Sequence, residues 1–388
     1  MRLRLLIPLI ALVVSVAACD DAPGVGLDLV RGEGLVPSGH RELVDSVNTT
    51  NGVDFTAGSS GSTTTTPQRV LGGIVQDPSL GTVTATPAVE FAGPTGSNLD
   101  GFRGKAVSSA TLTIPIKRGY YGDTTAAVTF ELRSLARELT TISIRSDSVL
   151  ATSGVVATVT AGPRDTVLTV SLPAAWVTAN DARLRSTSAA DTLHGFALAP
   201  ISGGQIRSIP FGSVVLTAVA GSDTARFAGT IGATHVARAG TPTLGSDVTL
   251  LQDGFPMRLT VPFDTSGIPS EAMARASLVL TYDTTRLVTP AGFVRPSPPR
   301  LTLVGMNAAG ATLLYNGVLF GQAVPSKGKV VFTSEALRRV FQDRRMGRSN
   351  DLARLAVQFA DFDAGLAALV VPAIGAVRPY YVFTTVSY

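Results

Sequence analysis

Short segments in which apolar and polar residues alternate, each bounded by turn-forming residues, recur along this chain from residue 67 onwards. In residues 107–117, Ala110, Leu112 and Ile114 fall on one face of an extended strand, because successive side chains of a strand point to opposite faces. Similar segments follow at residues 128–135, 166–172, 193–199 and 209–219. Together with 39 glycines and 23 prolines, this pattern predicts an all-β fold.

The order of these segments recurs in the second half of the chain. Residues 276–280 resemble residues 110–114, and in both halves a helical segment later follows a strand. We therefore predict two tandem β-sandwich-like modules, residues 67–220 and residues 221–388, each with one short helix. One extended sandwich that both halves share is the alternative.

The two predicted helices cover residues 174–185 and residues 335–346. Ser334 suits the N-cap of the second helix, because its hydroxyl can accept a hydrogen bond from a free backbone N–H of the first turn. Gly347 suits its end, because glycine adopts the left-handed conformation that follows many helices.

Residues 1–18 have the features of a secretory signal peptide. Arg2 and Arg4 precede an apolar run at residues 5–18, and the acidic pair Asp20 and Asp21 ends it. The run holds 14 residues, fewer than the about 20 that a membrane-spanning helix needs. Cleavage after this run is therefore expected, rather than a transmembrane span.

The segment Val16-Ala17-Ala18-Cys19 resembles the lipobox of bacterial lipoprotein precursors. The resemblance implies that Cys19 becomes the first residue of the mature chain and carries diacylglycerol and an acyl chain. Several acyl chains make a stable anchor, because each buried methylene contributes about 0.8 kcal/mol. Cys19 is the only cysteine, so intrachain disulfides are excluded. A secreted protein with an unmodified Cys19 is the alternative.

Residues 19–66 are rich in glycine, serine, threonine and aspartate. Such a composition buries little apolar surface, so we predict a flexible tether. An edge strand is the alternative for its apolar positions, which are Val44, Val47, Val53 and Phe55.

The charge of the chain points to no particular partner. The net charge is +4, and removing residues 1–18, which hold two arginines and no acid, leaves +2. This balance gives no support to nucleic-acid binding. The sequence leaves the oligomeric state open.

Residues 71–81, with the sequence Leu-Gly-Gly-Ile-Val-Gln-Asp-Pro-Ser-Leu-Gly, resemble a segment of an uncharacterised lipoprotein family of Bacteroidetes, classed only as a domain of unknown function. Residues 26–28 (Gly-Leu-Asp) and residues 109–123 are similar to further blocks of that family. The resemblance extends over most of the mature chain, and no single motif in it is specific. It implies a lipoprotein of the outer envelope and supplies no reaction.

The sequence contains no familiar catalytic or cofactor motif. The three histidines, His40, His194 and His235, are far apart in sequence, and no Gly-x-Ser-x-Gly elbow, phosphate-binding loop or His-Glu-x-x-His motif is present. We therefore expect no cofactor and no familiar enzyme.

Weaker candidates for a site lie in three segments. Asp361 and Asp363 alternate before a glycine as in a calcium loop, yet the further ligands and closing Glu of that loop are missing, so a solvated turn is the simpler interpretation. Asp77 lies in a segment whose Pro and Gly favour a simple turn, and it is kept as a candidate ligand-binding residue because the family resemblance centres on residues 71–81. Tyr120 and Tyr121, which lie in a predicted Gly-flanked turn, are candidates for stacking on sugars or for anchoring a hairpin.

Three functional hypotheses follow. The first is a lipid-anchored lipoprotein, with the outer membrane as the expected location, that binds polysaccharide or an envelope protein or acts as a scaffold. The second is a glycan-active enzyme of unfamiliar type, which would need two carboxylates about 5–10 Å apart in one pocket. The third is a structural component of an envelope or secretion assembly. Whether the domain faces the periplasm or the cell exterior stays open.

Overall fold

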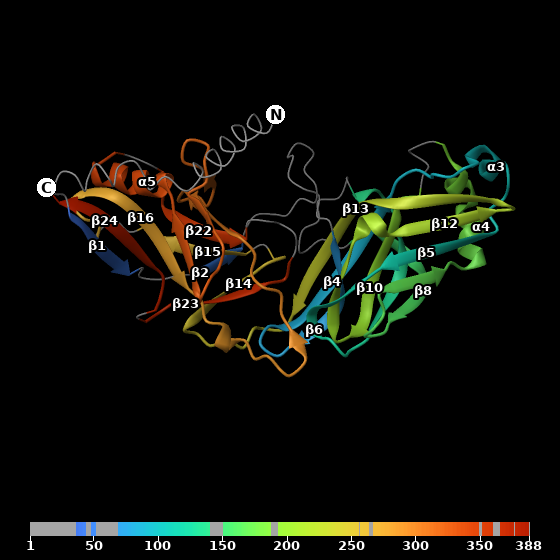
Figure 1. Cartoon of the computed structure of the whole chain (residues 1–388), viewed down its shortest axis with the longest axis horizontal. Helices are drawn as coiled ribbons and strands as arrows, with labels where there is room; N and C mark the ends of the chain where they lie inside the picture. The colour runs from blue at the N-terminus through green and yellow to red at the C-terminus, as the bar shows by residue number, and fades with distance from the viewer. Residues whose placement is uncertain are drawn as a thin grey trace, which may run out of the picture.

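The computed structural model describes residues 36–43, 48–51, 69–139, 150–187, 193–255, 257–263, 267–348, 351–359, 365–375 and 377–387. Within these residues the chain forms two β-sandwich lobes arranged along the long axis of the molecule (Figure 1). The predicted all-β fold is confirmed. Among the described residues, no helix is both long enough and apolar enough to cross a membrane.

Lobe 1 comprises the elements from β3 to β13. Its strands are β3 (Val70–Asp77), β4 (Gly81–Phe91), β5 (Ser109–Pro115), β6 (Lys117–Asp123), β7 (Val128–Leu135), β8 (Thr152–Ala161), β9 (Val167–Ser171), β10 (Gly195–Gly203), β11 (Gln205–Ile209), β12 (Val215–Ala220) and β13 (Asp223–Ala239). Its helical elements are α3 (Leu99–Arg103), α4 (Ala174–Arg185) and the 3-10 turn η3 (Phe211–Ser213). The helix predicted at residues 174–185 is thus present, and α3 is an additional short helix.

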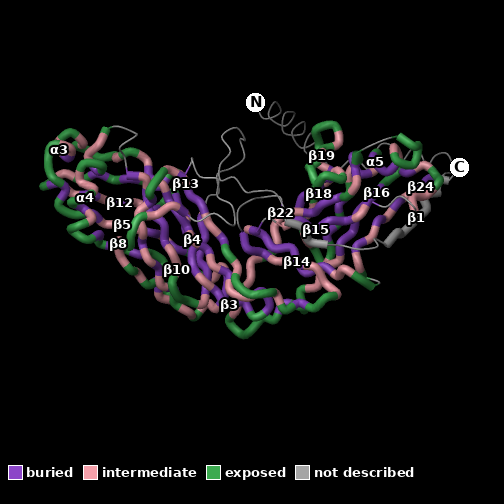
Figure 2. Tube along the Cα trace, turned by 180° about the vertical axis from the view of Figure 1, so that it is seen from behind, coloured by how far each residue is buried: buried purple, intermediate pink, exposed green. Residues whose placement is uncertain are grey.

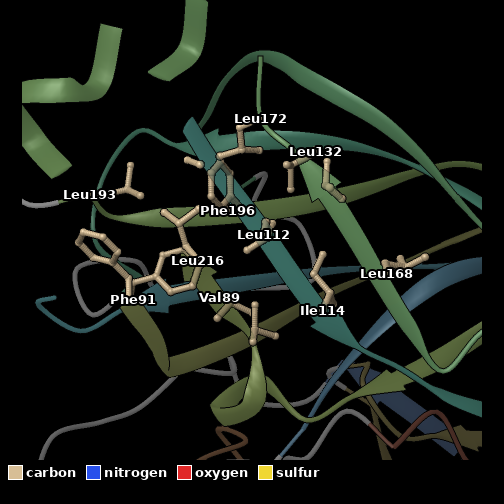
Figure 3. Packing of buried hydrophobic residues seen from close by; sticks show 14 of the residues in the cluster. Val89, Phe91, Leu112, Ile114, Leu132, Leu168, Leu172, Leu193, Phe196 and Leu216 are labelled. Carbon is tan, nitrogen blue, oxygen red and sulfur yellow. The ribbon is translucent and has the colours of Figure 1, made fainter. Parts of the chain in front are cut away.

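The core of lobe 1 lies between a layer formed by β12, β5 and β9 and a layer formed by β4, β10 and β7 (Figure 3). Ala110, Leu112 and Ile114 alternate with exposed or half-buried neighbours along β5 and are buried, as the sequence pattern predicts. Phe196 of β10 lies edge-on to Phe91 of β4, with ring centroids 5.9 Å apart. Burial of these apolar faces stabilises the two layers against each other.

Lobe 2 comprises the elements from β14 to β24 together with β1 and β2. Its strands are β1 (Val36–Leu43), β2 (Asn48–Asn51), β14 (Val248–Gln252), β15 (Met257–Pro262), β16 (Ala272–Thr281), β17 (Phe293–Val294), β18 (Leu301–Met306), β19 (Thr312–Leu313), β20 (Gly321–Ala323), β21 (Lys329–Thr333), β22 (Arg354–Phe359), β23 (Ala368–Pro372) and β24 (Tyr380–Ser387). Its helical elements are the 3-10 turn η4 (Thr284–Arg286) and α5 (Glu335–Arg345). The hydroxyl of Ser334 accepts a hydrogen bond from the Leu337 N–H at 3.0 Å, which confirms the predicted N-cap.

Strand pairing follows the same plan in both lobes. In lobe 1, β5 lies between β12 and β9, and in lobe 2, β16 lies between β24 and β21. In the opposite layers, β10 pairs with β7 and β4, whereas β22 pairs with β18 and β15. Each helix, α4 and α5, directly follows the edge strand of its first layer, β9 or β21. These matched pairings support an internal duplication that the weak sequence similarity alone leaves open.

The two lobes differ in which part of the sequence supplies the strand that joins their two layers. In lobe 1, β13 pairs first with β12, through residues 223–228, and then with β4. In lobe 2, β1 pairs with β24 and β2 pairs with β15, in the same order along the chain and also antiparallel. β1 and β2 therefore occupy in lobe 2 the place that β13 occupies in lobe 1, so the second repeat is circularly permuted.

This exchange changes the predicted domain boundaries. Residues 36–43 and residues 48–51, which lie within the predicted tether 19–66, form strands of lobe 2. The first module extends to Ala239, beyond the predicted boundary at residue 220, because β13 joins its two layers. Both boundaries depend on which distant strands pair with each other. The alternation of apolar and polar residues within one strand does not indicate which strand it pairs with.

We expect lobe 2 to need residues 36–51 for its stability. Eight residues of β1 pair with β24 and four of β2 pair with β15, and each backbone hydrogen bond of such a ladder contributes about 0.5–1.5 kcal/mol. A mature chain without residues 19–51 should therefore lose several kcal/mol, seen in thermal unfolding as a midpoint lowered by roughly 10 °C. A chain without residues 19–35, which keeps both strands, is the matched control. Equal midpoints for the two deletions would contradict this assignment.

Candidate functional site

The lobes meet around the carboxylate of Asp77, at the end of β3. Its Oδ1 accepts hydrogen bonds from the backbone N–H groups of Ser79 and Leu80, at 2.8 and 3.0 Å. Its Oδ2 accepts a hydrogen bond from the Tyr121 hydroxyl at 2.7 Å. The guanidinium of Arg295, from lobe 2, donates Nε to Oδ2 and Nη2 to Oδ1, each at 2.9 Å. We call these residues, Asp77, Tyr121 and Arg295, the junction cluster.

The tight turn from β3 to β4 aims the Asp77 carboxylate towards lobe 2. Asp77 itself holds the turn, because it bonds to the N–H groups two and three residues further on. Gly81 ends the turn with φ of +85°, and a Cβ there would lie 2.6 Å from the carbonyl oxygen of Ala239. The backbone of this turn therefore explains Asp77 and Gly81, the first and last residues of the Asp-Pro-Ser-Leu-Gly sequence.

Burial and hydrogen bonding act in opposite directions on the carboxyl of Asp77, whose side chain is 0% exposed. Burial by itself raises the pKa of Asp77, but hydrogen bonds from Arg295, Tyr121 and the Ser79 N–H outweigh it and hold the pKa below its ordinary value. Burial raises the pKa of the Tyr121 hydroxyl far above its ordinary range, and the neighbouring carboxylate raises it further. Tyr121 therefore stays a donor while Asp77 stays ionised.

Arg295 also ties together the segment of lobe 2 that reaches lobe 1. Its guanidinium donates to the carbonyl oxygen of Val288 and to the hydroxyl of Thr289, both at 2.7 Å, and lies 4.9 Å from the ring centroid of Phe293. The Val288 N–H donates in turn to the hydroxyl of Ser79 at 2.8 Å. Strand β17, which holds Phe293, pairs with β6 of lobe 1. Residues 287–295 thus contact lobe 1 through backbone and side-chain hydrogen bonds.

The two tyrosines of the predicted turn lie instead on strand β6, and the turn follows at Thr124 and Thr125. Tyr121 is buried in contact with Phe293, edge-on at 5.9 Å. The hydroxyl of Tyr120 donates to the carbonyl oxygen of Gly365 in lobe 2 at 2.6 Å. β6 therefore contributes both side chains to the junction.

Two apolar clusters surround this polar centre. One contains Leu71, Val75 and Tyr121 of lobe 1 together with Phe255 and Leu366 of lobe 2. The other places Leu80, at the tip of the β3–β4 turn, among residues of lobe 2, which are Leu244, Leu250, Leu287 and Val370. The junction thus combines a buried ion pair with apolar contacts on both sides of it, as in a stable interface.

An open pocket of 340 Å³ lies beside the junction cluster, against the β3–β4 turn and the end of β13. The described residues that line it are Gln76, Asp77, Pro78, Gly81, Thr82, Ala239, Gly240, Thr241 and Thr243. Asp77 is the one carboxylate in this lining, and it is paired with Arg295. This pocket therefore lacks the two neighbouring acids that a glycosidase mechanism needs.

Of the other residues singled out in the sequence, His194 and Trp176 do not belong to the junction cluster. Cys19, Asp361 and Asp363 fall outside the described residues. His194 is half-buried just before β10. Trp176 of α4 is partly buried against the core of lobe 1 and donates its ring N–H to the hydroxyl of Ser134 at 2.9 Å. Among the residues that the structure describes, no three histidine, cysteine or acidic side chains gather as a metal site.

The structure thus brings together Asp77, Tyr120 and Tyr121, which are the three predicted ligand-binding residues. Their polar atoms bond to the protein itself, and a ligand role for them stays a prediction. The sequence analysis did not predict Arg295, which completes the cluster. Its partner Asp77 lies more than 200 positions earlier, and nothing in residues 290–299 indicates that pairing. The cluster of Pro and Gly in that segment signals only a loop.

No family model matches this chain, and no curated protein matches its sequence. Among solved structures, a candidate secreted protein from Parabacteroides distasonis matches with 7% identity and a TM-score of 0.23, over 90% of this chain and 98% of that one. A mutant VP2 protein of infectious bursal disease virus matches with 11% identity and a TM-score of 0.07, over 91% of this chain and 78% of that one. Such low TM-scores support no conclusion about this chain, and its resemblance to the Bacteroidetes lipoprotein family stays a prediction.

We expect Arg295→Gln to destabilise the fold by about 3–5 kcal/mol, because the variant leaves a buried carboxylate without its counter-charge. Arg286→Gln is the matched control, since Arg286 pairs with Asp247 at 2.7 Å while both side chains are 40–45% exposed. An exposed pair of this kind contributes under about 1 kcal/mol. Urea denaturation measures the free energy of unfolding of both variants. Equal decreases would show that the junction ion pair stabilises the fold no more than an exposed pair does.

The lowered pKa of Asp77 makes the free energy of unfolding depend on pH. Its ionised form is favoured more in the folded chain than in the unfolded one, so this stabilisation is complete above the unfolded pKa of about 4. It is lost as the pH falls below that value and through the lower folded pKa. In urea titrations between pH 6 and pH 2, we expect the wild type to lose more stability than Asp77→Asn does. Parallel curves would exclude Asp77 as the source.

Proposed function

We propose that this chain is a lipid-anchored bacterial envelope lipoprotein in which two rigidly joined β-sandwich lobes form a binding or scaffold unit. The junction cluster is the observation that carries the proposal. Its ion pair and the two neighbouring apolar clusters join lobes that share one strand plan, which supports the proposal that the lobes act as one elongated body. An elongated body of fixed shape suits presentation of a surface at a distance from a membrane.

The signal peptide and the Val-Ala-Ala-Cys sequence support the anchor. The lone cysteine lies directly after the small residues at which cleavage is expected. Lipid on Cys19 would retain the protein at the envelope, and the outer membrane is the location that the family resemblance suggests. Without lipid, a chain with this leader would be released after secretion.

The pocket beside the junction cluster supports a binding role towards polysaccharide. Three threonines, Thr82, Thr241 and Thr243, line it together with Gln76. Hydroxyl and amide groups both donate and accept hydrogen bonds, as recognition of neutral sugar hydroxyls requires. An envelope protein that recognises the same fixed surface is the alternative partner.

The anchor and the binding role are tested on one pair of full-length chains, the wild type and Cys19→Ala. We expect palmitate labelling and membrane retention of the wild type, and an unlabelled, uncleaved precursor for Cys19→Ala. Detergent-solubilised wild-type protein is then used for envelope pull-downs and glycan arrays. Labelling that survives in Cys19→Ala overturns the anchor, and silence in both binding assays overturns the binding role.

A further inference from the structure

The anchor-proximal chain enters the fold at the outer tip of lobe 2. β1 begins with Val36, which pairs with Ser387 at the end of β24, and Val386 next to it pairs with Ala272 at the start of β16. In Figures 1 and 2 this tip, marked by the C-terminus, lies at the end of the molecule opposite to lobe 1. The seventeen residues 19–35 separate Cys19 from this point and span at most about 60 Å when fully extended.

Helix α5 lies at the same tip. The guanidinium of Arg338 donates to the carbonyl oxygen of Met273 at 3.2 Å, and that of Arg345 donates to the carbonyl oxygen of Glu271. Met273 lies at the start of β16 and Glu271 directly precedes that strand, close to where β24 pairs with β16 and with β1. The helix is therefore held beside the point at which the chain arrives from Cys19.

The charge of α5 and its C-terminal turn is strongly positive. Residues 334–348 contain five arginines and only two acids, Glu335 and Asp343. Glu335 bonds to Arg338 and Arg339 at 2.6 and 2.7 Å, and Asp343 pairs with Arg348 at 3.2 Å. The arginines at positions 338 and 339 lower the pKa of Glu335 to about 2, so it stays ionised and the segment keeps a net charge of +3.

The end of α5 also exposes apolar surface. Arg344, Arg345, Met346 and Arg348 are all exposed, and the Met346 side chain is among the large apolar groups that solvent reaches. Exposed cations beside an apolar side chain form a surface that suits the headgroup region of an anionic bilayer.

We propose that the C-terminal end of α5 docks onto anionic phospholipid, so that lobe 2 lies against the membrane and lobe 1 is presented away from it. This inference rests on the proposed function, because lipid at Cys19 would hold the chain at the membrane. The contact through α5 depends on the charge of that helix and can be tested without the lipid. The chain order alone would place the earlier lobe nearer the anchor. The permuted strands β1 and β2 reverse that order.

The α5 contact is tested with the mature chain carrying Cys19→Ser, which removes lipid as a cause of binding. Co-sedimentation with phosphatidylglycerol vesicles at low salt is compared with phosphatidylcholine vesicles. Combined Arg344→Gln, Arg345→Gln and Arg348→Gln should weaken binding roughly 100-fold, at about fivefold per arginine. The control removes three exposed arginines of lobe 1 by Arg164→Gln, Arg183→Gln and Arg226→Gln, and should bind as the parent does.

Absence of binding by the parent chain, equal binding to neutral vesicles, or equal losses in the two triple variants would overturn the docking surface. Binding of the parent that persists at high salt would also contradict it, because exposed charges are screened within about 3 Å at 1 M salt. A wild type that takes up no palmitate, while the Cys19→Ser chain still binds anionic vesicles through α5, would refute the anchor and support this docking surface.

Fluorescence measures the orientation independently. Trp176 is the only tryptophan and lies in lobe 1, so brominated lipids in the vesicles should leave its emission unchanged. Met346→Trp adds a second tryptophan on the proposed docking surface, and its emission should be quenched when the vesicles are anionic. Quenching of Trp176 in the parent chain, or an unquenched tryptophan at position 346, would overturn the orientation.

Discussion

The ion pair between Asp77 and Arg295 holds the two lobes of this protein in one arrangement. Five hydrogen bonds reach the buried carboxylate, and two of them come from the other lobe. A buried carboxylate without such partners costs several kcal/mol, so the pair tolerates little displacement of one lobe against the other. The apolar clusters on both sides supply contact area, and the ion pair makes their register specific.

A second long-range dependence lies in the strands that complete lobe 2. The chain visits lobe 2 first through β1 and β2, then builds all of lobe 1, and then returns to finish lobe 2. Lobe 1 is complete once β13 has been made, whereas lobe 2 joins segments more than 300 residues apart. Contacts at such separation are expected to form late in folding, because the intervening chain must be closed first.

The junction ion pair and the pairing of β1 and β2 with lobe 2 together determine which parts of the chain lie at the two ends of the molecule. The permuted strand β1 begins at the tip of lobe 2 beside α5, and the junction cluster joins lobe 2 to lobe 1 away from that tip. The segment that resembles a lipoprotein family, residues 71–81, is central to the junction because it contains the β3–β4 turn. The turn motif therefore has a structural use, and the pocket proposed to bind a ligand lies beside it.

The sequence alone determined the β character, the two helices with the Ser334 cap, and the alternation along β5, because all of these depend on residues within one turn or one strand of each other. It also singled out Asp77, through the family resemblance of residues 71–81, and Tyr120 and Tyr121, through their aromatic side chains beside glycines. Only the tertiary structure decided that Tyr121 and Asp77 meet Arg295, and that residues 36–51 belong to lobe 2. The reason is physical: a strand's pattern records which face is buried, whereas its partner is set by pairing and burial across hundreds of residues.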